Sequence, residues 1–405
     1  MNLGQILIVY RKELRDTLRD RRTLVSMIVI PLILMPFLII GMTTMSLKLI
    51  KKAQEEASTV MIFGEDQAPA LAEKIRSTEG IEVVPPADDY VHRIEEKKLR
   101  AALEFPEGFQ ELLETGSAPD DFTVKIYHYE GEMRSSFAVR NLQKILRDYR
   151  DEVVEERLAK RDLSIEILKP FQTREQNVAS PEKVGGNIMG GLLPYIIILL
   201  SLTGAMYPAI DLTAGEKERG TMETILASPV SRGSLATGKF LTVLTASVAT
   251  ALLAILSLAT TLRLAPSFTD LGPRGDIPIF KMALNVQGVT AIIAMILPLA
   301  VLFSATLLAI ALLAKSYKEA QSYISPLMIV VILPSVASML PGIELDSKLV
   351  WIPILNVSLV CKEILTGTFH WNWILLIFLS SSIYAAGALF IAARAFQRES
   401  VLFRT

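Results

Sequence analysis

The sequence predicts an α-helical polytopic membrane protein with six transmembrane helices and an extracytoplasmic α/β domain inserted between helices 1 and 2. Hydrophobic residues make up 51% of the chain and the mean hydropathy is +0.42, which is more apolar than a soluble chain of 405 residues usually is. Six stretches also lack Asp, Glu, Lys and Arg, and each exceeds the roughly 20 residues that cross a bilayer. They cover 23–47, 184–210, 240–262, 282–314, 320–343 and 364–393.

The composition excludes several classes of function. The net charge is −1, so no overall basic field indicates a nucleic-acid partner. The single cysteine, Cys361, excludes an intramolecular disulfide framework and any cysteine-based metal cluster within one chain. The three histidines lie far apart in the sequence, which argues against a metal site. We therefore expect no cofactor and no metal.

The N-terminal segment 1–22 is predicted to form an amphipathic helix at the cytoplasmic membrane surface. Its apolar residues recur at steps of three and four, opposite a basic face. The simpler alternative is an anchor whose basic residues only set the orientation. The first transmembrane helix, 23–47, then carries two prolines, which kink helices and free backbone carbonyls. The apolar residues of the N-terminal segment are Leu3, Ile6, Leu7, Tyr10, Leu14 and Leu18.

Lysine and arginine near the helix ends predict the orientation of the chain. With six spans the basic segments fall on one side, so we expect both termini in the cytoplasm of a cell whose (inner) membrane holds the chain. Residues 48–183 then lie outside; they hold 21 Lys/Arg against 28 Asp/Glu, a net charge of −7. The orienting residues are Arg11, Lys12, Arg15, Arg19, Arg21, Arg22, Lys217, Arg219, Arg232, Lys239, Lys315, Lys318, Arg394, Arg398 and Arg404.

Residues 48–183 are predicted to form a small α/β domain, because short strands alternate with helices. We find no nucleophile–base arrangement or metal-ligand cluster in this segment, and we interpret His128 as a strand residue. The expected strands are 59–64, 81–84, 101–105 and 122–129. The expected helices are 67–78, 88–99, 107–115 and 134–162.

Residues 184–405 are predicted to form a five-helix transmembrane domain. Residues 211–237 are predicted to form a cytoplasmic loop of this domain. Its residues 211–229 combine charges with a short helix that Thr221 can cap and that Pro229 ends. An acidic residue in the first turn suits the helix dipole. A helix this short needs a surface to rest on, such as a partner subunit. The alternative is an ordinary polar loop.

Residues 233–240 match only part of a nucleotide-binding P-loop. The spacing of Gly233, Gly238 and Lys239 fits, but Phe240 occupies the Ser/Thr position that would bind Mg²⁺. No strand precedes the motif, and an apolar helix follows it. We expect Gly238 and Lys239 to mark the cytoplasmic entry of the third helix. The chain is therefore expected not to be an enzyme and not to hydrolyse ATP itself.

Two further segments belong to the second half of the chain. The loop 263–281 holds three prolines and is expected to be external. Residues 349–361 are apolar but too short to span, which favours a re-entrant or interfacial segment packed against protein. The apolar stretches lack charges, and this argues against a proton-coupled secondary carrier, which usually buries acidic residues.

Several of these features together resemble a known family over nearly the whole chain. They are the basic segment 11–22 followed by Pro31 and Pro36, the domain between the first two apolar stretches, and residues 216–229 with Gly238 and Lys239. The chain is similar to the permease subunit of ABC-type exporters of the second ABC-permease class, in particular the NatB-like sodium-efflux branch. The motifs are specific to the permease class and poorly specific to its substrate.

The resemblance implies a half-transporter in the lipid bilayer. Two permeases, identical or related, would pair and dock onto two copies of a cytoplasmic ABC ATPase subunit. In similar proteins the loop after the second span contacts the ATPase, and an interfacial helix flanks that contact. The matching interfacial-helix positions are Lys12, Glu13 and Arg15. The matching ATPase-coupling positions are Glu216, Glu218, Arg219, Gly220, Thr221 and Glu223.

Two other classes of function compete with ATP-driven export. A membrane-anchored sensor or assembly protein would act through its extracytoplasmic α/β domain, yet five apolar stretches after that domain exceed what an anchor needs. A membrane-bound enzyme would need paired ionisable residues in its spans, or a motif such as HExxH or GxSxG, and the sequence contains neither.

Overall fold

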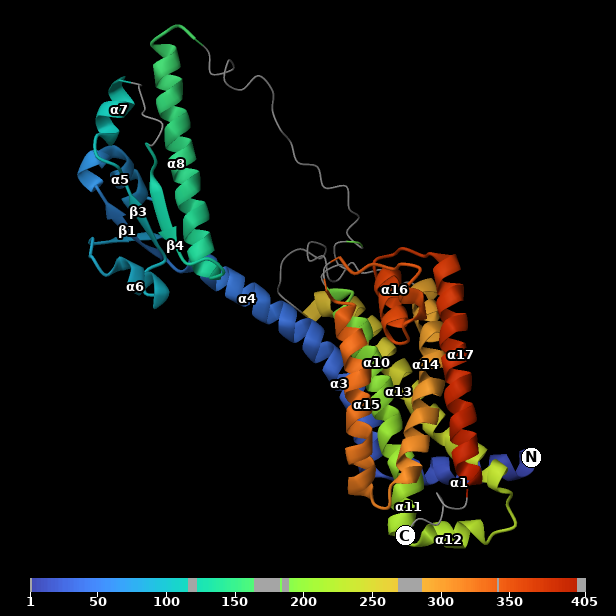
Figure 1. Cartoon of the computed structure of the whole chain (residues 1–405). Helices are drawn as coiled ribbons and strands as arrows, with labels where there is room; N and C mark the ends of the chain where they lie inside the picture. The colour runs from blue at the N-terminus through green and yellow to red at the C-terminus, as the bar shows by residue number, and fades with distance from the viewer. Residues whose placement is uncertain are drawn as a thin grey trace. The chain divides into compact units, whose positions relative to one another are not determined.

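The chain forms two compact units in the computed structural model, which describes residues 2–115, 122–163, 183, 189–268, 286–340 and 342–398. The first unit contains Met1–Thr43 and Val178–Thr405, and the second contains Thr44–Asn177 (Figure 1). Most of the loop expected at 263–281 and the start of the apolar stretch 184–210 lie outside the described residues.

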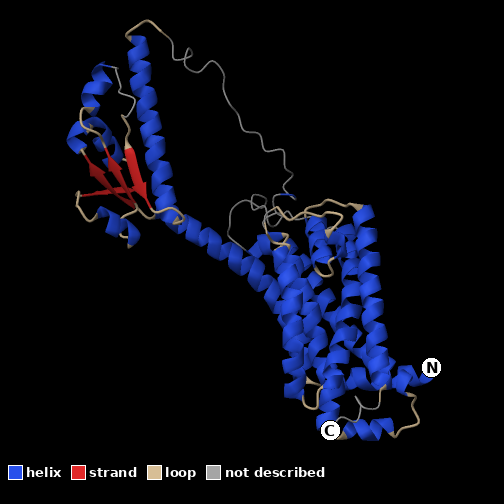
Figure 2. Ribbon diagram, viewed as in Figure 1, coloured by secondary structure: helices blue, strands red, loops and turns tan. Residues whose placement is uncertain are grey.

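Within the described residues, six helices are long and apolar enough to cross a membrane, as the sequence predicts. Each has at least 21 residues, which suffices for the hydrocarbon core of a bilayer. Helices dominate the structure, and strands occur only in the second unit among the residues described (Figure 2). The six helices are Arg21–Ala53, Leu192–Glu218, Arg232–Leu264, Val286–Leu313, Tyr317–Ala337 and Trp371–Gln397.

A capped turn separates the N-terminal helix α1 (Leu3–Thr17) from the first of these six helices. The carboxylate of Asp20 accepts hydrogen bonds from the Thr23 backbone N–H at 2.9 Å and from its hydroxyl at 2.7 Å. Partial burial alone would raise the pKa of Asp20, but these bonds hold it below its ordinary value. This N-cap therefore fixes where the apolar helix begins.

The first apolar helix is a composite of α-helical and π-helical pieces. Pro31 and Pro36 have no backbone N–H to donate, so the regular hydrogen-bond ladder cannot run through them. A wider π-helical turn precedes the first proline, and another follows the second. These turns let the helix continue through both prolines. The pieces are α2 (Arg21–Leu24), the π turn Val25–Val29, α3 (Ile30–Pro36), the π turn Phe37–Gly41 and α4 (Met42–Glu55).

The centre of the first unit is α10 (Leu192–Ile210). Its membrane-length window is 78% buried within the chain, whereas α15 (Tyr317–Ala337) and α17 (Trp371–Gln397) bury only 22% and 28%. α10 packs against α13 (Arg232–Phe268) and α14 (Val286–Leu313), and α14 packs along α17. The outer helices therefore present apolar surfaces that suit acyl chains.

Close packing of α10 on α13 depends on Gly204. A Cβ atom at this position would lie 2.2 Å from the Thr250 hydroxyl oxygen and 2.6 Å from its Cβ. We expect Gly204→Ala to destabilise the first unit by about 1–3 kcal/mol, the usual cost of overpacking. Thermal unfolding of the full chain in mild detergent would measure this. Gly387→Ala is the matched control, because Gly387 on α17 has open space around it; equal stability of the two variants would contradict the prediction.

The apolar segment 349–361 contributes a short helix, α16 (Leu355–Leu365), whose 11 residues are too few to cross a bilayer. The Asn356 side-chain amide donates to a carbonyl of the preceding turn at 2.8 Å. The hydroxyls of Ser338 and Ser358 lie 2.7 Å apart and join α16 to the end of α15. Figure 1 shows α16 at the end of the first unit opposite α1.

The second unit is a small α/β structure. Its sheet has the order β2–β1–β3–β4, with β1 parallel to β2 and β3, and β4 antiparallel to β3. All four strands lie where the sequence predicts them; β2 has the predicted ends, and the ends of the other three differ by up to three positions. The strands are β1 (Ser58–Phe63), β2 (Ile81–Val84), β3 (Ala101–Glu104) and β4 (Lys125–His128). The main helices are α5 (Pro69–Arg76), α6 (Tyr90–Glu95), α7 (Phe109–Thr115) and α8 (Met133–Ala159).

Helices cover both faces of this sheet because successive strand residues point to opposite sides. On one face Ile75 of α5 and Leu142 of α8 share a buried cluster with Val60. On the other face Ile94 of α6 packs with Met61. His128 ends β4, as interpreted from the sequence.

Candidate coupling site

The helix that contains α10 continues past the point where the sequence predicts a loop. A π-helical turn, Asp211–Gly215, and the short α11 (Glu216–Glu218) extend it by two turns. The expectation that this helix ends near Asp211 is therefore wrong. The Thr213 hydroxyl donates to the Ala209 carbonyl at 2.6 Å and helps to satisfy the backbone at the π turn.

A buried ion pair anchors this extension to α13. Lys239 has a side-chain exposure of 0% and Glu216 one of 6%, and the Lys239 ammonium bonds directly to the Glu216 carboxylate. The same ammonium donates to the Leu212 carbonyl at 2.6 Å. A buried charge is tolerated when it is paired and hydrogen-bonded. Removing either residue would therefore leave the other charge buried and unpaired. Lys239 thus lies two turns inside α13, rather than at the helix entry that the sequence indicates.

The interfacial helix α1 packs directly on α13. A Cβ atom on Gly238 would lie 2.6 Å from Val9 Cγ1, so the absence of a side chain there lets the two helices meet. The Tyr10 hydroxyl is 3.0 Å from that of Thr245. The contact therefore fixes α1 against the same turn of α13 that carries Lys239.

The face of α1 that packs on the protein differs from most of the predicted apolar stripe, which is left free to contact lipid. Ile6, Val9, Glu13 and Thr17 are buried, whereas Leu3, Leu7 and Leu18 are exposed. Glu13 lies on this packed face near the buried ion pair, and its charge is balanced by Lys12 at 3.0 Å. Partial burial would lower the pKa of Lys12, but the carboxylates of Glu13, Glu216 and Asp16 raise it above its ordinary value.

Two charged side chains tie the extension to other helices, and a third closes an ion pair within the extension. The Lys217 ammonium donates to the Leu312 carbonyl at the end of α14, at 2.5 Å. Glu218 accepts a bond from the Tyr317 backbone N–H at the start of α15, at 2.6 Å. Arg219 pairs with Asp211 at 2.9 Å. The extension is thereby connected to α13, α14 and α15 at one end of the bundle.

The short helix α12 (Thr221–Leu226) follows, at the end of the unit that also carries α1 (Figure 1). Its N-cap is Gly220, with φ of +69°, a backbone conformation that favours glycine. The prediction that Thr221 is the cap is wrong: it is the first helical residue, and its hydroxyl donates to the Glu216 carbonyl at 3.2 Å. Within α12, the side chain of Met222 is buried and that of Glu223 is exposed.

The residues predicted for coupling separate into two groups. Glu216 and Glu13 are buried and hold helices together, whereas Glu223 and Arg15 are exposed at the surface. The sequence analysis did not identify Lys239 as the partner of Glu216. Residues 233–239 form the first turns of α13 rather than a phosphate-binding loop. Within the described residues, no group of three His, Cys, Asp or Glu side chains could hold a metal ion.

Comparison with known proteins gives two matches. A sequence model of the family described as ABC-2 family transporter protein matches residues 21–394. The chain is 32% identical to the ABC transporter permease protein NatB of Bacillus subtilis (strain 168) over 363 residues, which is 89% of each chain. No solved structure matches.

Proposed function

The chain belongs to the ABC-2 family of transporter proteins and is the permease subunit of an ABC transporter, and we propose that separate cytoplasmic ATPase subunits drive export through it by docking on α1 and α12. We place these helices in the cytoplasm, on the side of the basic residues. The second unit then lies outside the cell membrane. Two permeases pair in this proposal, and each receives one ATPase subunit.

The observation that carries the proposal is the continuity between α12 and the buried core. Glu216, the first residue of α11, is bonded to Lys239 of α13, and the Thr221 hydroxyl of α12 donates back to the Glu216 carbonyl. The same turn of α13 carries α1 through Gly238. A force applied to α12 and α1 would therefore reach α10 and α13 through these bonds and this close contact.

A buried pair suits this task better than a surface pair. Exposed ion pairs contribute little and are exchanged easily with water. A buried pair that loses one partner leaves an uncompensated charge, so its two helices are held in one arrangement. ATP-driven closure of the ATPase subunits would thus move α10 and α13 together and open the path on the outer side.

Sodium is the cargo that we propose, from the resemblance to the NatB-like branch. The membrane-length windows of the six helices hold at most two charged residues each. An ion path would then be lined by hydroxyls and backbone carbonyls rather than by carboxylates. ATP-driven uptake of ²²Na⁺ into inside-out vesicles that contain the chain and its ATPase would test this cargo.

Charge reversal on α12 tests the docking surface. Glu223 is exposed on that helix, so Glu223→Arg is expected to leave folding intact and to lower permease-stimulated ATPase activity by about tenfold, the effect of losing roughly 1.4 kcal/mol of binding. The ATPase rate in reconstituted vesicles measures this. Glu155→Arg, on exposed α8 of the second unit, is the matched control. Equal rates for both variants would remove α12 from the docking surface.

Affinity purification of the tagged full chain tests the assembly itself. We expect a stoichiometric ATPase subunit to co-purify in mild detergent and to be lost with Glu223→Arg. Its reproducible absence, with the ATPase co-expressed, would overturn the proposed function. The hypothesis that would then remain is a sensor or assembly role for the second unit.

A further inference from the structure

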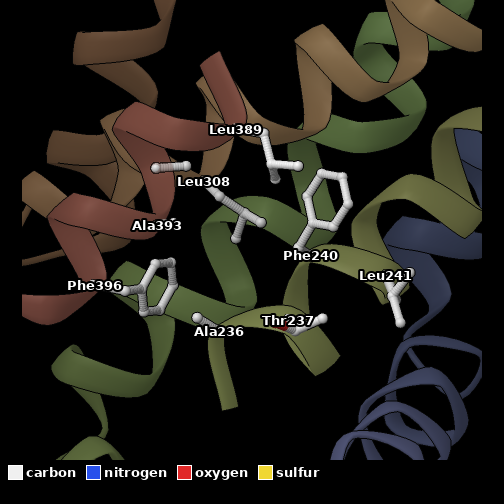
Figure 3. Close-up of a pocket in the computed structure, with 9 residues that line it drawn as sticks. Ala236, Thr237, Phe240, Leu241, Leu308, Leu389, Ala393 and Phe396 are labelled. Atoms are coloured by element: carbon white, nitrogen blue, oxygen red, sulfur yellow. The ribbon is translucent and has the colours of Figure 1, made fainter. Parts of the chain in front are cut away.

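An apolar cavity of about 310 Å³ lies between α13, α14 and α17, and the coupling site does not use it. In Figure 3 the side chains of Phe240, Leu308, Leu389 and Phe396 gather around this space. Its volume is at the lower end of the range for small-molecule sites. Thr237 is the polar residue of the lining, and its hydroxyl already donates to the Gly233 carbonyl at 2.8 Å. A polar ligand would therefore find almost no partner in the walls.

The cavity is partly open, and Leu389 of α17, one of its lining residues, is also exposed on the apolar surface of that helix. Along α17 the side chains of Leu379, Ile383 and Phe390 are exposed and apolar. Because α17 is one of the membrane-length helices, these residues meet hydrocarbon. A lipid tail can thus enter the cavity from the side without leaving an apolar environment.

Cationic side chains lie next to the cavity at the end where α17 finishes. Arg394 lies between the lining residues Ala393 and Phe396 of α17, Arg398 caps the end of this helix, and both are exposed. Within the described residues neither has a carboxylate within 4.0 Å; the Arg394 guanidinium lies 5.7 Å from the centre of the Phe390 ring. Arginine binds phosphate through a planar set of donors, and long cationic side chains near helix ends reach the headgroup level.

We propose that this cavity holds one acyl chain of an anionic phospholipid whose phosphate is bound by Arg394 and Arg398. An apolar slot of limited size explains the tail. Two arginines that have no acidic partner among the described residues explain the preference for negative charge. The lipid would fill the gap between α13, α14 and α17 at the end that carries α1. The inference concerns lipid binding and does not depend on the ATPase.

The test uses the full chain in vesicles that contain a trace of phosphatidylglycerol with a photoactivatable group on one acyl chain. After illumination, peptides are analysed for label by mass spectrometry. We expect label on the peptides around Phe240 and Leu389. Ala393→Trp fills the cavity and should lower that label by about tenfold. Ala386→Trp is the matched control, since it is two turns away on the same exposed side of α17 and does not line the cavity.

A second arm compares headgroups and does not depend on filling the cavity. Photoactivatable phosphatidylcholine should label these peptides several-fold less than phosphatidylglycerol, and Arg394→Gln with Arg398→Gln should abolish the difference. Label spread evenly along α17 and unchanged by Ala393→Trp would overturn the proposal. So would equal labelling by the two lipids in the wild type, or cross-linking of the cavity peptides to a second copy of the chain in place of lipid.

Discussion

Replacing Lys239 with methionine is expected to cause the largest loss of stability of any single change in the coupling site. The substitution leaves the Glu216 carboxylate buried without its cation. Breaking a buried pair in this way typically costs about 3–5 kcal/mol. The Leu212 carbonyl also loses a hydrogen bond of 2.6 Å. Thermal unfolding of the full chain in mild detergent should therefore begin several degrees lower, and stimulation of the ATPase should be lost.

The double variant Lys239→Met with Glu216→Leu separates charge from packing. Replacing both members of a buried pair with apolar residues of similar size is often neutral or stabilising. We expect thermal stability to return close to that of the wild type, while ATPase stimulation stays low because α11 is no longer held by a directed bond. Recovery of both properties would limit the pair to a structural role. Wild-type stability in Lys239→Met alone would contradict the burial of the pair.

The transmembrane helices and the strands could be predicted because they follow from local chemistry. A run of some 20 residues without charge has few alternatives to a membrane helix. In the second unit, β2 begins and ends at the predicted residues, and the other strands differ by a few positions at their ends. Pro31 and Pro36 predicted an irregular first helix, but prolines alone do not specify that the irregular parts are π-helical turns.

The buried face of α1 could not be predicted from periodicity alone. Leu3, Leu7 and Leu18 mark an apolar stripe, and in a soluble protein that stripe would face the core. At a membrane surface an apolar face can contact lipid, so the helix is free to turn another face to the protein. The face that contacts α13 is chosen by Gly238, which makes room for Val9, and this pairing leaves no periodic signal.

The burial of Glu216 depends on a partner 23 positions away in the sequence. Local reasoning placed Glu216 in an exposed charged loop, because its neighbours Lys217, Glu218 and Arg219 are charged. A signal was nevertheless present. Lys239 is the only charged residue in 233–262, and a lone charge in a membrane helix requires a partner. The candidate partner for this charge was an acidic residue near the end of the preceding helix.

The contact between α1 and α13 gives the second large expected effect. Gly238→Leu would place side-chain atoms where Val9 lies, since even a Cβ atom would be 2.6 Å from Val9 Cγ1 and 3.2 Å from the Tyr10 backbone nitrogen. Overpacking of this kind costs about 1–3 kcal/mol. The cost can be avoided only if α1 leaves α13, so the docked population of α1 should fall by about tenfold or more. We expect ATPase stimulation to fall with it.

Membrane insertion should survive Gly238→Leu, because leucine raises helix propensity and the six apolar helices are unchanged. Gly387→Leu is the matched control: it adds the same side chain to α17, where a Cβ atom meets nothing within 4 Å. A cysteine pair that joins α1 to α13 would report the displacement, with cross-linking lost in Gly238→Leu and kept in Gly387→Leu. If α1 stays cross-linked while stimulation falls, the ATPase senses α13 directly; if stimulation persists after α1 is displaced, α1 is an anchor and α12 alone transmits the force.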